Sequence, residues 1–369
     1  MKAKLSLGIM VLSAVLAGLI LRFGFSGERN FEDAALGTMT VSYEARSIDG
    51  RDIHTTKQRE KEIAEMLSVA SDGRRSTLIL GNSQTHSINQ KKEGEVVYPE
   101  ILDRAFSERT VLTNSLPNAN LQEFYLILNW WLETVIFDQI VVPVFMDDLR
   151  EDGLREDFLT ALIQENFALS GELDDFDQSL NEQLRSLQPQ THAESSESSD
   201  SETPQDFVEK EINSWLAAHS KTWANRPNAR GDLFMKLYSW RNILFNISAT
   251  TKRKMIPARM SKNLLALDRI LERTSEDSID VLLYIPPIRR DVEVPYDLAE
   301  YAQFKSEVES MAAAYSHVQF KNWEGIVPGE LWGLKASTNG KKEPELDFMH
   351  FQFKGHQILA DSILTALKP

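Results

Sequence analysis

The chain contains a serine whose position and neighbours are typical of a catalytic nucleophile. Ser83 stands in Gly81-Asn82-Ser83-Gln84, after the apolar run of residues 77–80 and before residues that can start a helix. Open α/β sheets place their reactive groups at the carboxyl ends of strands, and Ser83 is predicted to lie there. A serine hydroxyl is a weak nucleophile, so it needs a neighbouring base, a carboxylate that orients the base, and donors for the oxyanion that develops.

The base and its orienting carboxylate are predicted near the C-terminus. Asp347 and His350 are three residues apart, a spacing that lets both side chains face the same way on a turn or a first helical turn. His350 could then face Ser83 while Asp347 holds the other imidazole nitrogen. Spacing alone leaves an alternative open, in which Ser83 caps a helix and His350 is an ordinary surface or core histidine. His356 is a rival base, and it lies inside the final helical pattern.

Together, these two motifs resemble those of the SGNH/GDSL hydrolase superfamily. In that superfamily a Gly-Asp-Ser block near the N-terminus carries the nucleophile, and an Asp-x-x-His motif near the C-terminus carries the rest of the triad. The resemblance covers about residues 75–150 and 278–369. It implies Ser83 as the nucleophile, His350 as general base and then general acid, and Asp347 as the orienting partner of His350.

Two positions depart from the superfamily pattern around the oxyanion. Where the second block has a glycine, this chain has Asn118, which keeps a backbone N–H and tolerates left-handed conformations. The resemblance therefore implies an oxyanion hole formed by the N–H groups of Ser83 and Asn118. Where the third block has an asparagine side chain, this chain has Asp147, which accepts rather than donates when ionised. Capping of the next helix at Leu149 is an alternative role for Asp147 and Asp148.

Other side chains are candidates for lining the same site. Asn82, His86 and Asp147 are predicted to lie near Ser83, although an exposed position in the first turn of a helix is the alternative for His86. Arg289 and Arg290 follow another predicted strand, where they could bind an anionic substrate or form a solvated charged turn. No His/Asp/Glu cluster has metal-ligand spacing, and no Gly-rich loop could cradle a phosphate, so neither a metal nor a cofactor is expected.

Apolar strands alternate with helical patterns along the chain. This alternation predicts an α/β fold with a doubly wound, flavodoxin-like parallel sheet of about five strands flanked by helices. Strands are expected at 77–80, 110–112, 140–145, 281–285 and 318–320. Helices are expected at 57–70, 121–132, 154–168, 206–218, 232–247, 261–274, 297–315 and 355–367.

One long stretch interrupts the alternation. Residues 150–275 contain helical patterns and no convincing strand, which predicts a helical insertion within a domain of residues 28–369. Inside it, residues 188–206 are acidic and have no apolar side chain larger than alanine. Such a segment cannot bury enough surface to offset its ordering entropy, so a disordered loop is expected there.

The N-terminal segment, residues 1–27, is predicted to be a membrane anchor. Lys2 and Lys4 precede an apolar run of residues 5–21, which continues past a weak cleavage motif. Positive charge before the run and acidic residues after it place the bulk of the chain outside the cytoplasm, in the periplasm or at the cell surface. A buried N-terminal helix is one alternative, and a cleaved segment that leaves a soluble lipase-like hydrolase is another.

Composition excludes several classes of function. The chain has 369 residues, a formal net charge of −15 and no cysteine. The negative charge argues against a nucleic-acid partner, and the missing cysteines exclude disulfides and thiolate chemistry. The resemblance implies a serine-dependent acyl-ester hydrolase or O-acyltransferase of cell-envelope or secreted polysaccharide, with a membrane-bound O-acyltransferase as its partner. The alternative is a catalytically weak scaffold or binding component of an envelope polysaccharide complex.

Overall fold

A computed structural model describes residues 39–188, 242–245, 247–335, 337 and 343–367. The predicted anchor, the acidic loop beyond residue 188 and the helix expected at 206–218 lie outside the described residues, as does most of the helix expected at 232–247. Among the residues that are described, no helix is long and apolar enough to cross a membrane. The chain divides into two units, and the unit formed by Thr38–Gln190, Ser248–Ser337 and Glu343–Pro369 contains the sheet.

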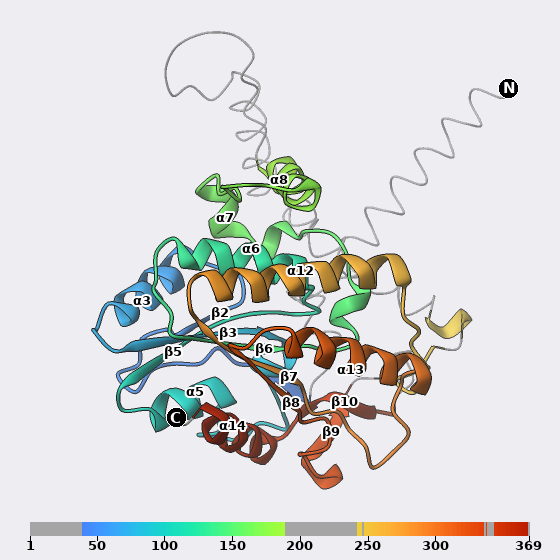
Figure 1. The fold of residues 1–369 in the computed structure, drawn as a ribbon. Helices are drawn as coiled ribbons and strands as arrows, with labels where there is room; N and C mark the ends of the chain where they lie inside the picture. The colour runs from blue at the N-terminus through green and yellow to red at the C-terminus, as the bar shows by residue number, and fades with distance from the viewer. Residues whose placement is uncertain (1–38, 189–241, 246, 336, 338–342, 368–369) are drawn as a thin grey trace, which may run out of the picture. The chain divides into compact units, whose positions relative to one another are not determined.

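A six-stranded parallel sheet forms the centre of this unit (Figure 1). Its strand order is β2-β5-β3-β6-β7-β8. The strands are β2 (His54–Thr55), β3 (Arg75–Asn82), β5 (Arg109–Leu116), β6 (Gln139–Pro143), β7 (Asp280–Ile285) and β8 (Val318–Asn322). The predicted α/β class with a parallel, helix-flanked sheet is thus confirmed. The five predicted strands follow one another in the 2-1-3-4-5 order of flavodoxin-like sheets, and the two-residue β2 adds a sixth that is too short to leave a pattern in the sequence.

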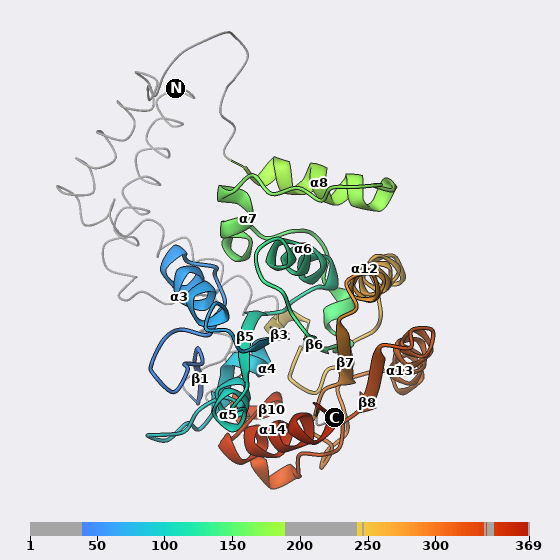
Figure 2. The same ribbon diagram turned by 60° about the vertical axis from the view of Figure 1, so that its left-hand side comes forward.

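The two faces of the sheet are covered by different helices (Figures 1 and 2). Along β3, Leu78 and Leu80 belong to one apolar core and Ile79 belongs to the other, because successive side chains of a strand point to opposite faces. The first core includes side chains from α3 (Glu60–Ala70), α6 (Leu121–Leu132), α12 (Pro257–Glu276) and α13 (Leu298–Ala313). The second includes side chains from α5 (Tyr98–Ala105) and α14 (Phe353–Leu367).

The connection between β6 and β7 differs in part from the expected helices. The helix expected at 154–168 is a 3-10 turn, Glu156–Phe158, followed by the short α7, Thr160–Gln164. Asn166 follows α7 with a φ of +52°, which a helix cannot contain. A second helix, α8 (Asp175–Leu187), was not expected, although Asp174 caps it by accepting the N–H groups of Phe176 and Asp177. The last helix of the connection, α12, packs on α6.

Two small antiparallel pairs complete the described fold. One consists of β1 (Thr40–Ser42) and β4 (Ser87–Asn89), and the other of β9 (Trp332–Lys335) and β10 (Glu345–Phe351). The register of the second pair shifts between Leu346 and Phe351, so the residues between them bulge out of the ladder. Asp347 and His350 lie in this bulge rather than on a turn or first helical turn. The helix that was expected to follow them, α14, begins at Phe353.

Candidate active site

The structure brings Ser83, His350 and Asp347 into one hydrogen-bonded chain. The Nε2 atom of His350 is 3.0 Å from Oγ of Ser83, and its Nδ1 atom is 3.0 Å from Oδ2 of Asp347. Because an ionised carboxylate only accepts, Nδ1 carries the imidazole proton and Nε2 is left to accept from the serine hydroxyl. This is the geometry that a nucleophile, a base and an orienting carboxylate require.

Asn82 fixes the turn that presents Ser83. Ser83 begins the short helix α4 (Ser83–His86) directly after β3, and Oδ1 of Asn82 accepts the N–H of Gln84 at 3.1 Å. The N-cap of this helix is therefore Asn82. The alternative in which Ser83 caps the helix is wrong. Because Asn82 rather than Ser83 makes the capping hydrogen bond, the hydroxyl of Ser83 can face His350.

The glycine of the motif is required by how closely α4 folds back on β3. A Cβ atom at Gly81 would lie 2.2 Å from Oγ1 and 2.6 Å from Cβ of Thr85. Thr85 is fully buried and its hydroxyl is 3.1 Å from that of Tyr98, so it has no room to move aside. Any larger residue at position 81 would push α4, and Ser83 with it, away from the sheet.

Gln84 joins the nucleophile turn to the segment that carries the histidine. Its Nε2 atom donates to the carbonyl of Met349 at 2.7 Å and to the carbonyl of Pro287 at 2.9 Å. Met349 precedes His350 in the bulge of β10, and Pro287 follows the end of β7. One amide group thus fixes the distance between Ser83 and His350. The role of Gln84 was not predicted from the sequence, where the only signal is its place beside Ser83.

Asp347 is buried and its oxygen atoms are fully engaged. It is 1% exposed, and its Oδ1 atom accepts the N–H groups of Met349 at 2.9 Å and His350 at 3.0 Å. Nδ2 of Asn89 lies 3.3 Å from Oδ2. Burial acts to raise the pKa of Asp347, but the charge interaction and hydrogen bond with His350, together with the two backbone N–H groups, hold that pKa well below its usual range. Asp347 is therefore ionised at neutral pH.

The predicted oxyanion residue Asn118 has a conformation that suits the role. It lies in the exposed turn between β5 and α6 with a φ of +47°, the left-handed region that glycine commonly occupies. Its backbone N–H donates to no other described residue. That N–H is consequently available to a ligand, and the assignment of Ser83 and Asn118 to an oxyanion hole stays a prediction.

Asp147, the residue at the position of the superfamily asparagine, is bound to cations. Its carboxylate accepts from Arg150 at 2.9 Å, from Nη1 of Arg253, and from the hydroxyl of Tyr296 at 2.9 Å. Burial acts to raise the pKa of Asp147, but Arg253 and Arg150 hold it below its usual value. An ionised group held in this way connects chain segments and donates nothing to an oxyanion. Although Asp147 precedes a 3-10 turn, Asp148–Arg150, its side chain makes no capping bond.

Asp148, by contrast, is a buried carboxyl group beside the nucleophile turn. Its Oδ2 atom accepts the N–H of Phe145 at 2.9 Å and lies 3.4 Å from Nδ2 of Asn82. Burial raises the pKa of Asp148 well above its usual value, and the nearby charge of Asp147 acts in the same direction. Through these contacts Asn82 connects the end of β6 to the turn that carries Ser83.

Histidine 86 lies in the interior and not at an exposed position in the first turn of a helix. It is fully buried, and its Nδ1 atom is 2.7 Å from Oγ of Ser115. The same hydroxyl is 2.6 Å from Nε2 of His54, whose Nδ1 atom accepts the N–H of Ala45. Burial lowers the pKa of His54 well below its usual value, so His54 is neutral. His86 thus belongs to a buried polar cluster beside β5.

His356, the rival base, is also fully buried. Its Nδ1 atom accepts the N–H of Tyr98 at 3.3 Å, and its Nε2 atom is 3.1 Å from the carbonyl of Ser87. Burial lowers the pKa of His356 to about 3. Both ring nitrogens are occupied by backbone groups, so His356 has no nitrogen left to act on a serine.

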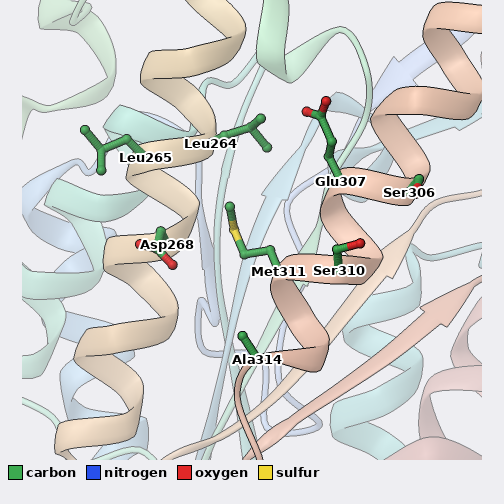
Figure 3. Close-up of a pocket in the computed structure, with 8 residues that line it drawn as sticks. All are labelled: Leu264, Leu265, Asp268, Ser306, Glu307, Ser310, Met311 and Ala314. Atoms are coloured by element: carbon green, nitrogen blue, oxygen red, sulfur yellow. The ribbon is translucent and has the colours of Figure 1, made fainter.

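No metal site accompanies these residues in the described parts of the chain, where no three His, Asp or Glu side chains could hold an ion together. A groove between α12 and α13 is lined by apolar side chains, two serines and two acidic residues (Figure 3). The lining includes Leu264, Leu265, Asp268, Glu307, Met311 and Ala314. None of the candidate catalytic residues lines this groove, so it is a separate surface feature.

Comparisons with known proteins leave the family of the chain open. The sequence matches no protein-family model and no curated protein. Several solved structures are similar at low levels, and three of them are described here. One, provisionally described as a platelet activating factor from Streptococcus pneumonia, is 12% identical with a TM-score of 0.37 over 85% of this chain and 94% of its own.

The second is the alpha/beta hydrolase LAE5 from the metagenome of Lake Arreo, Spain, which is 9% identical with a TM-score of 0.37 over 81% of this chain and 97% of its own. The third is the acetylxylan esterase Axe2 from Geobacillus stearothermophilus, 11% identical with a TM-score of 0.36 over 79% of this chain and 93% of its own. Similarity at this level assigns neither a family nor an activity to the chain.

Proposed function

We propose that the protein is a serine-dependent ester hydrolase or O-acyltransferase of the SGNH type, which acts through an acyl-enzyme. The observation that carries the proposal is the contact of 3.0 Å between Nε2 of His350 and Oγ of Ser83, with Asp347 on the opposite nitrogen. In the proposed reaction Ser83 attacks the acyl carbonyl and its proton passes to Nε2 of His350. His350 then gives this proton to the leaving alcohol oxygen, and the acyl group stays on Ser83.

The second half of the reaction reverses these proton transfers. Water or a sugar hydroxyl attacks the acyl-enzyme while Nε2 of His350 takes its proton. Collapse of the tetrahedral intermediate returns that proton to Oγ of Ser83 and releases an acid or a new ester. In this scheme the N–H groups of Ser83 and Asn118 bind the oxyanion. Because Asp147 supplies no donor, the hole has one donor fewer than the superfamily pattern, and loss of one donor typically costs about 10²–10³ in kcat.

The cellular setting is part of the proposal and rests on the sequence. We propose an acylated cell-envelope or secreted polysaccharide as the substrate and a membrane-bound O-acyltransferase as the partner. Residues 1–27 would anchor the protein in the membrane, with the bulk of the chain in the periplasm or at the cell surface. A mass spectrum of the mature protein tests the anchor, because a cleaved segment would remove the corresponding mass.

A scaffold role is the second candidate function, and one observation favours it. The carboxylate of Asp147 occupies the place of a superfamily donor and is held by Arg150 and Arg253. On this alternative the protein would bind an acylated glycan within an envelope complex and turn it over slowly or not at all. The retained contacts among Ser83, His350 and Asp347 oppose it.

A fluorophosphonate probe, which reacts with activated serines, separates the two functions. We expect the wild-type protein to be labelled, Ser83→Ala to be unlabelled, and Ser71→Ala, which changes an exposed serine after α3, to be labelled like the wild type. Wild-type protein that has not been exposed to the probe should also release acetate from an acetylated polysaccharide, and labelling should abolish this release because it blocks Oγ of Ser83. A well-folded wild type that takes up no label would favour the scaffold.

A further inference from the structure

The two arginines that follow β7 are engaged with carboxylates. Arg289 pairs with Asp291 and also donates to the carbonyl of Gly333 at 3.0 Å. Arg290 pairs with Glu324. The sequence-based idea that Arg289 and Arg290 bind an anionic substrate therefore finds both side chains held by acidic partners of their own.

A different arginine, Arg155 in the connection between β6 and β7, binds the turn that contains Asn118. Its Nη1 atom donates to the carbonyl of Pro117, the residue before Asn118, at 2.6 Å. The other side of the guanidinium binds Glu123 twice, with Nε 2.9 Å from Oε1 and Nη2 donating to Oε2. Glu123 is fully buried in the first turn of α6, and the ring of Phe158 lies 4.6 Å from Cζ of the guanidinium. These contacts fix the guanidinium on the carbonyl of Pro117.

The bond to Pro117 controls the direction of the N–H group of Asn118. The carbonyl of Pro117 and this N–H belong to one peptide group, which is planar and trans. The two therefore point in opposite directions, and the N–H points away from Arg155. Without Arg155, this peptide group in a turn with an exposed tip would lose the bond that sets its orientation.

The same N–H lies at the edge of the sheet that carries Ser83. Strands β3 and β5 are neighbours, and Asn82 at the end of β3 is paired with Leu116 at the end of β5. Ser83 and Pro117 are the next residues of these two strands, and adjacent strands lie about 4.8 Å apart. Helix α6 lies on one side of the sheet, whereas β10, with the candidate base, lies on the other (Figures 1 and 2). An N–H that points away from α6 consequently faces the side of the base.

The positive charge of Arg155 also makes this N–H a stronger donor. A hydrogen bond from a charged group is roughly twice as strong as one between neutral groups. A guanidinium on the carbonyl oxygen draws electron density from the nitrogen of the same peptide group, and such coupling strengthens a neighbouring hydrogen bond by about 10–30%. Because Asp147 supplies no donor to an oxyanion, the direction and strength of the remaining N–H groups matter more in this chain.

We propose that Arg155 is a positioning residue of the oxyanion hole, which aims and polarises the N–H of Asn118 through the carbonyl of Pro117. Arg155 itself touches neither the substrate nor the reacting atoms. The inference deepens the proposed function and rests on it, because the acceptor is the oxyanion that forms when Ser83 attacks an ester. Its effect is therefore expected in the transition state, where charge develops on the carbonyl oxygen, and hardly in the ground state.

Kinetics on 4-nitrophenyl acetate test in which state Arg155 acts. We expect Arg155→Met to lower kcat by about tenfold, which is less than the loss of about 10²–10³ for a missing donor, because the N–H remains but is poorly aimed. KM should change less than about twofold, since both halves of the reaction pass through an oxyanion and substrate binding does not. Arg155→Lys should recover most of kcat, because an ammonium group can also bind the carbonyl.

Two further variants separate this effect from a loss of stability. Arg259→Met is the matched control, since Arg259 also donates to a backbone carbonyl, that of Arg150, at 2.8 Å. It should leave kcat and KM unchanged. Because Arg155→Met leaves the buried Glu123 without its cation, the double variant Glu123→Gln/Arg155→Met is measured beside it and should show the same loss of kcat.

Trifluoroacetone gives a measurement without turnover, by fluorine NMR of its adduct with the full-length protein. Oγ of Ser83 bonds to the carbonyl carbon, the hydroxyl proton passes to Nε2 of His350, and the electron pair of the C=O bond becomes an oxyanion. We expect the adduct to dissociate about ten times more readily in Arg155→Met and in the double variant than in the wild type or in Arg259→Met.

The outcomes distinguish the inference from the proposed function. Equal kcat and equal adduct affinity in the wild type and in a folded variant without Arg155 would overturn the inference and leave the proposed function intact. An equal loss in Arg259→Met, or a rise in KM with kcat unchanged, would also overturn it. If the wild type forms no adduct and takes up no fluorophosphonate label, the proposed function fails and the inference fails with it.

Discussion

Asp347 and Asp147 lie at the same edge of the fold, both have a lowered pKa, and yet they are built for different tasks. Asp347 faces the imidazole of His350, whose other nitrogen contacts the hydroxyl of Ser83 and can accept its proton. Asp147 faces the guanidinium groups of Arg150 and Arg253, which are always charged. A carboxylate that faces an imidazole can orient a catalytic base. A carboxylate that faces permanent cations connects chain segments instead. A perturbed pKa therefore marks a candidate site, and the partner tells what the group does.

Substitution of Asp347 should have the largest effect on activity. In Asp347→Asn the amide donates to Nδ1 of His350, so the imidazole proton moves to Nε2 and Ser83 loses its acceptor. We expect kcat on 4-nitrophenyl acetate to fall by about 10⁴-fold while the circular dichroism spectrum stays that of the wild type. A loss smaller than tenfold in folded protein would show that Asp347 does not orient a catalytic histidine.

Substitution of Gln84 should have the next largest effect, because this residue sets the distance between the two halves of the site. Gln84→Leu removes both donors of the amide that bridges Met349 and Pro287. Misplacement of a catalytic group by about 1 Å typically costs about 10²-fold, and we expect a loss of that size in kcat with a smaller change in KM. Gln183→Leu on α8, whose amide bonds only to Ser179 of its own helix, is the matched control. Equal activity of both variants would contradict the role of Gln84.

Asp147→Asn should lower the stability of the protein and change its activity little, which is the opposite of what we expect for Asp347→Asn. The change removes the charge that holds two arginines, while an amide can still accept one hydrogen bond. The side chain of Asp147 is 22% exposed, so solvent screens part of the interaction, and we expect the free energy of unfolding to fall by about 2 kcal/mol. We also expect kcat to change less than tenfold. Urea unfolding with parallel kinetics checks both, and a catalytic loss with unchanged stability would place Asp147 in the reaction.

The elements that position the site were accessible from the sequence where the pattern was long and regular. The helix expected at 121–132 has the same bounds as α6, and β3, β5, β6, β7 and β8 all lie where apolar runs predicted strands. Ser83, His350 and Asp347 were singled out because their two motifs together resemble those of a known superfamily, and the structure brings their side chains into one hydrogen-bonded chain. Asn118 was singled out because it stands where the superfamily's second block has a glycine, and its φ of +47° lies in the left-handed region that asparagine tolerates.

The partners of the buried polar side chains could not be predicted from the sequence, because they lie on distant segments of the chain. Nothing near Gln84 in the sequence indicates that its amide reaches the carbonyl groups of Met349 and Pro287. His86 was considered as a residue that lines the site or as an exposed residue in a first helical turn, but it is fully buried and contacts Ser115. Pairing of buried polar groups is a property of the folded chain, so residue types alone do not reveal it.

The comparison between the aspartates extends to two histidines, because His350 contacts the side chains of Ser83 and Asp347 whereas His356 contacts backbone groups. Both nitrogens of His356 bind backbone groups, and burial lowers its pKa to about 3, against about 6.5 in an unfolded chain. Between these pH values the unfolded chain binds one more proton than the folded chain at this residue. The stabilisation from neutral His356 is therefore complete above pH 6.5 and is lost as the pH falls toward 3.

His54, whose pKa burial also lowers, contributes in the same direction. In His356→Gln the amide can accept from Tyr98 and donate to Ser87 without titrating. We expect the slope of unfolding free energy against pH, measured in urea between pH 4 and 6, to be smaller than in the wild type by about 1.4 kcal/mol per pH unit. A slope equal to that of the wild type would mean that His356 is protonated inside the fold. Its place among backbone groups would then not be what keeps it neutral, and the distinction from His350 would fail.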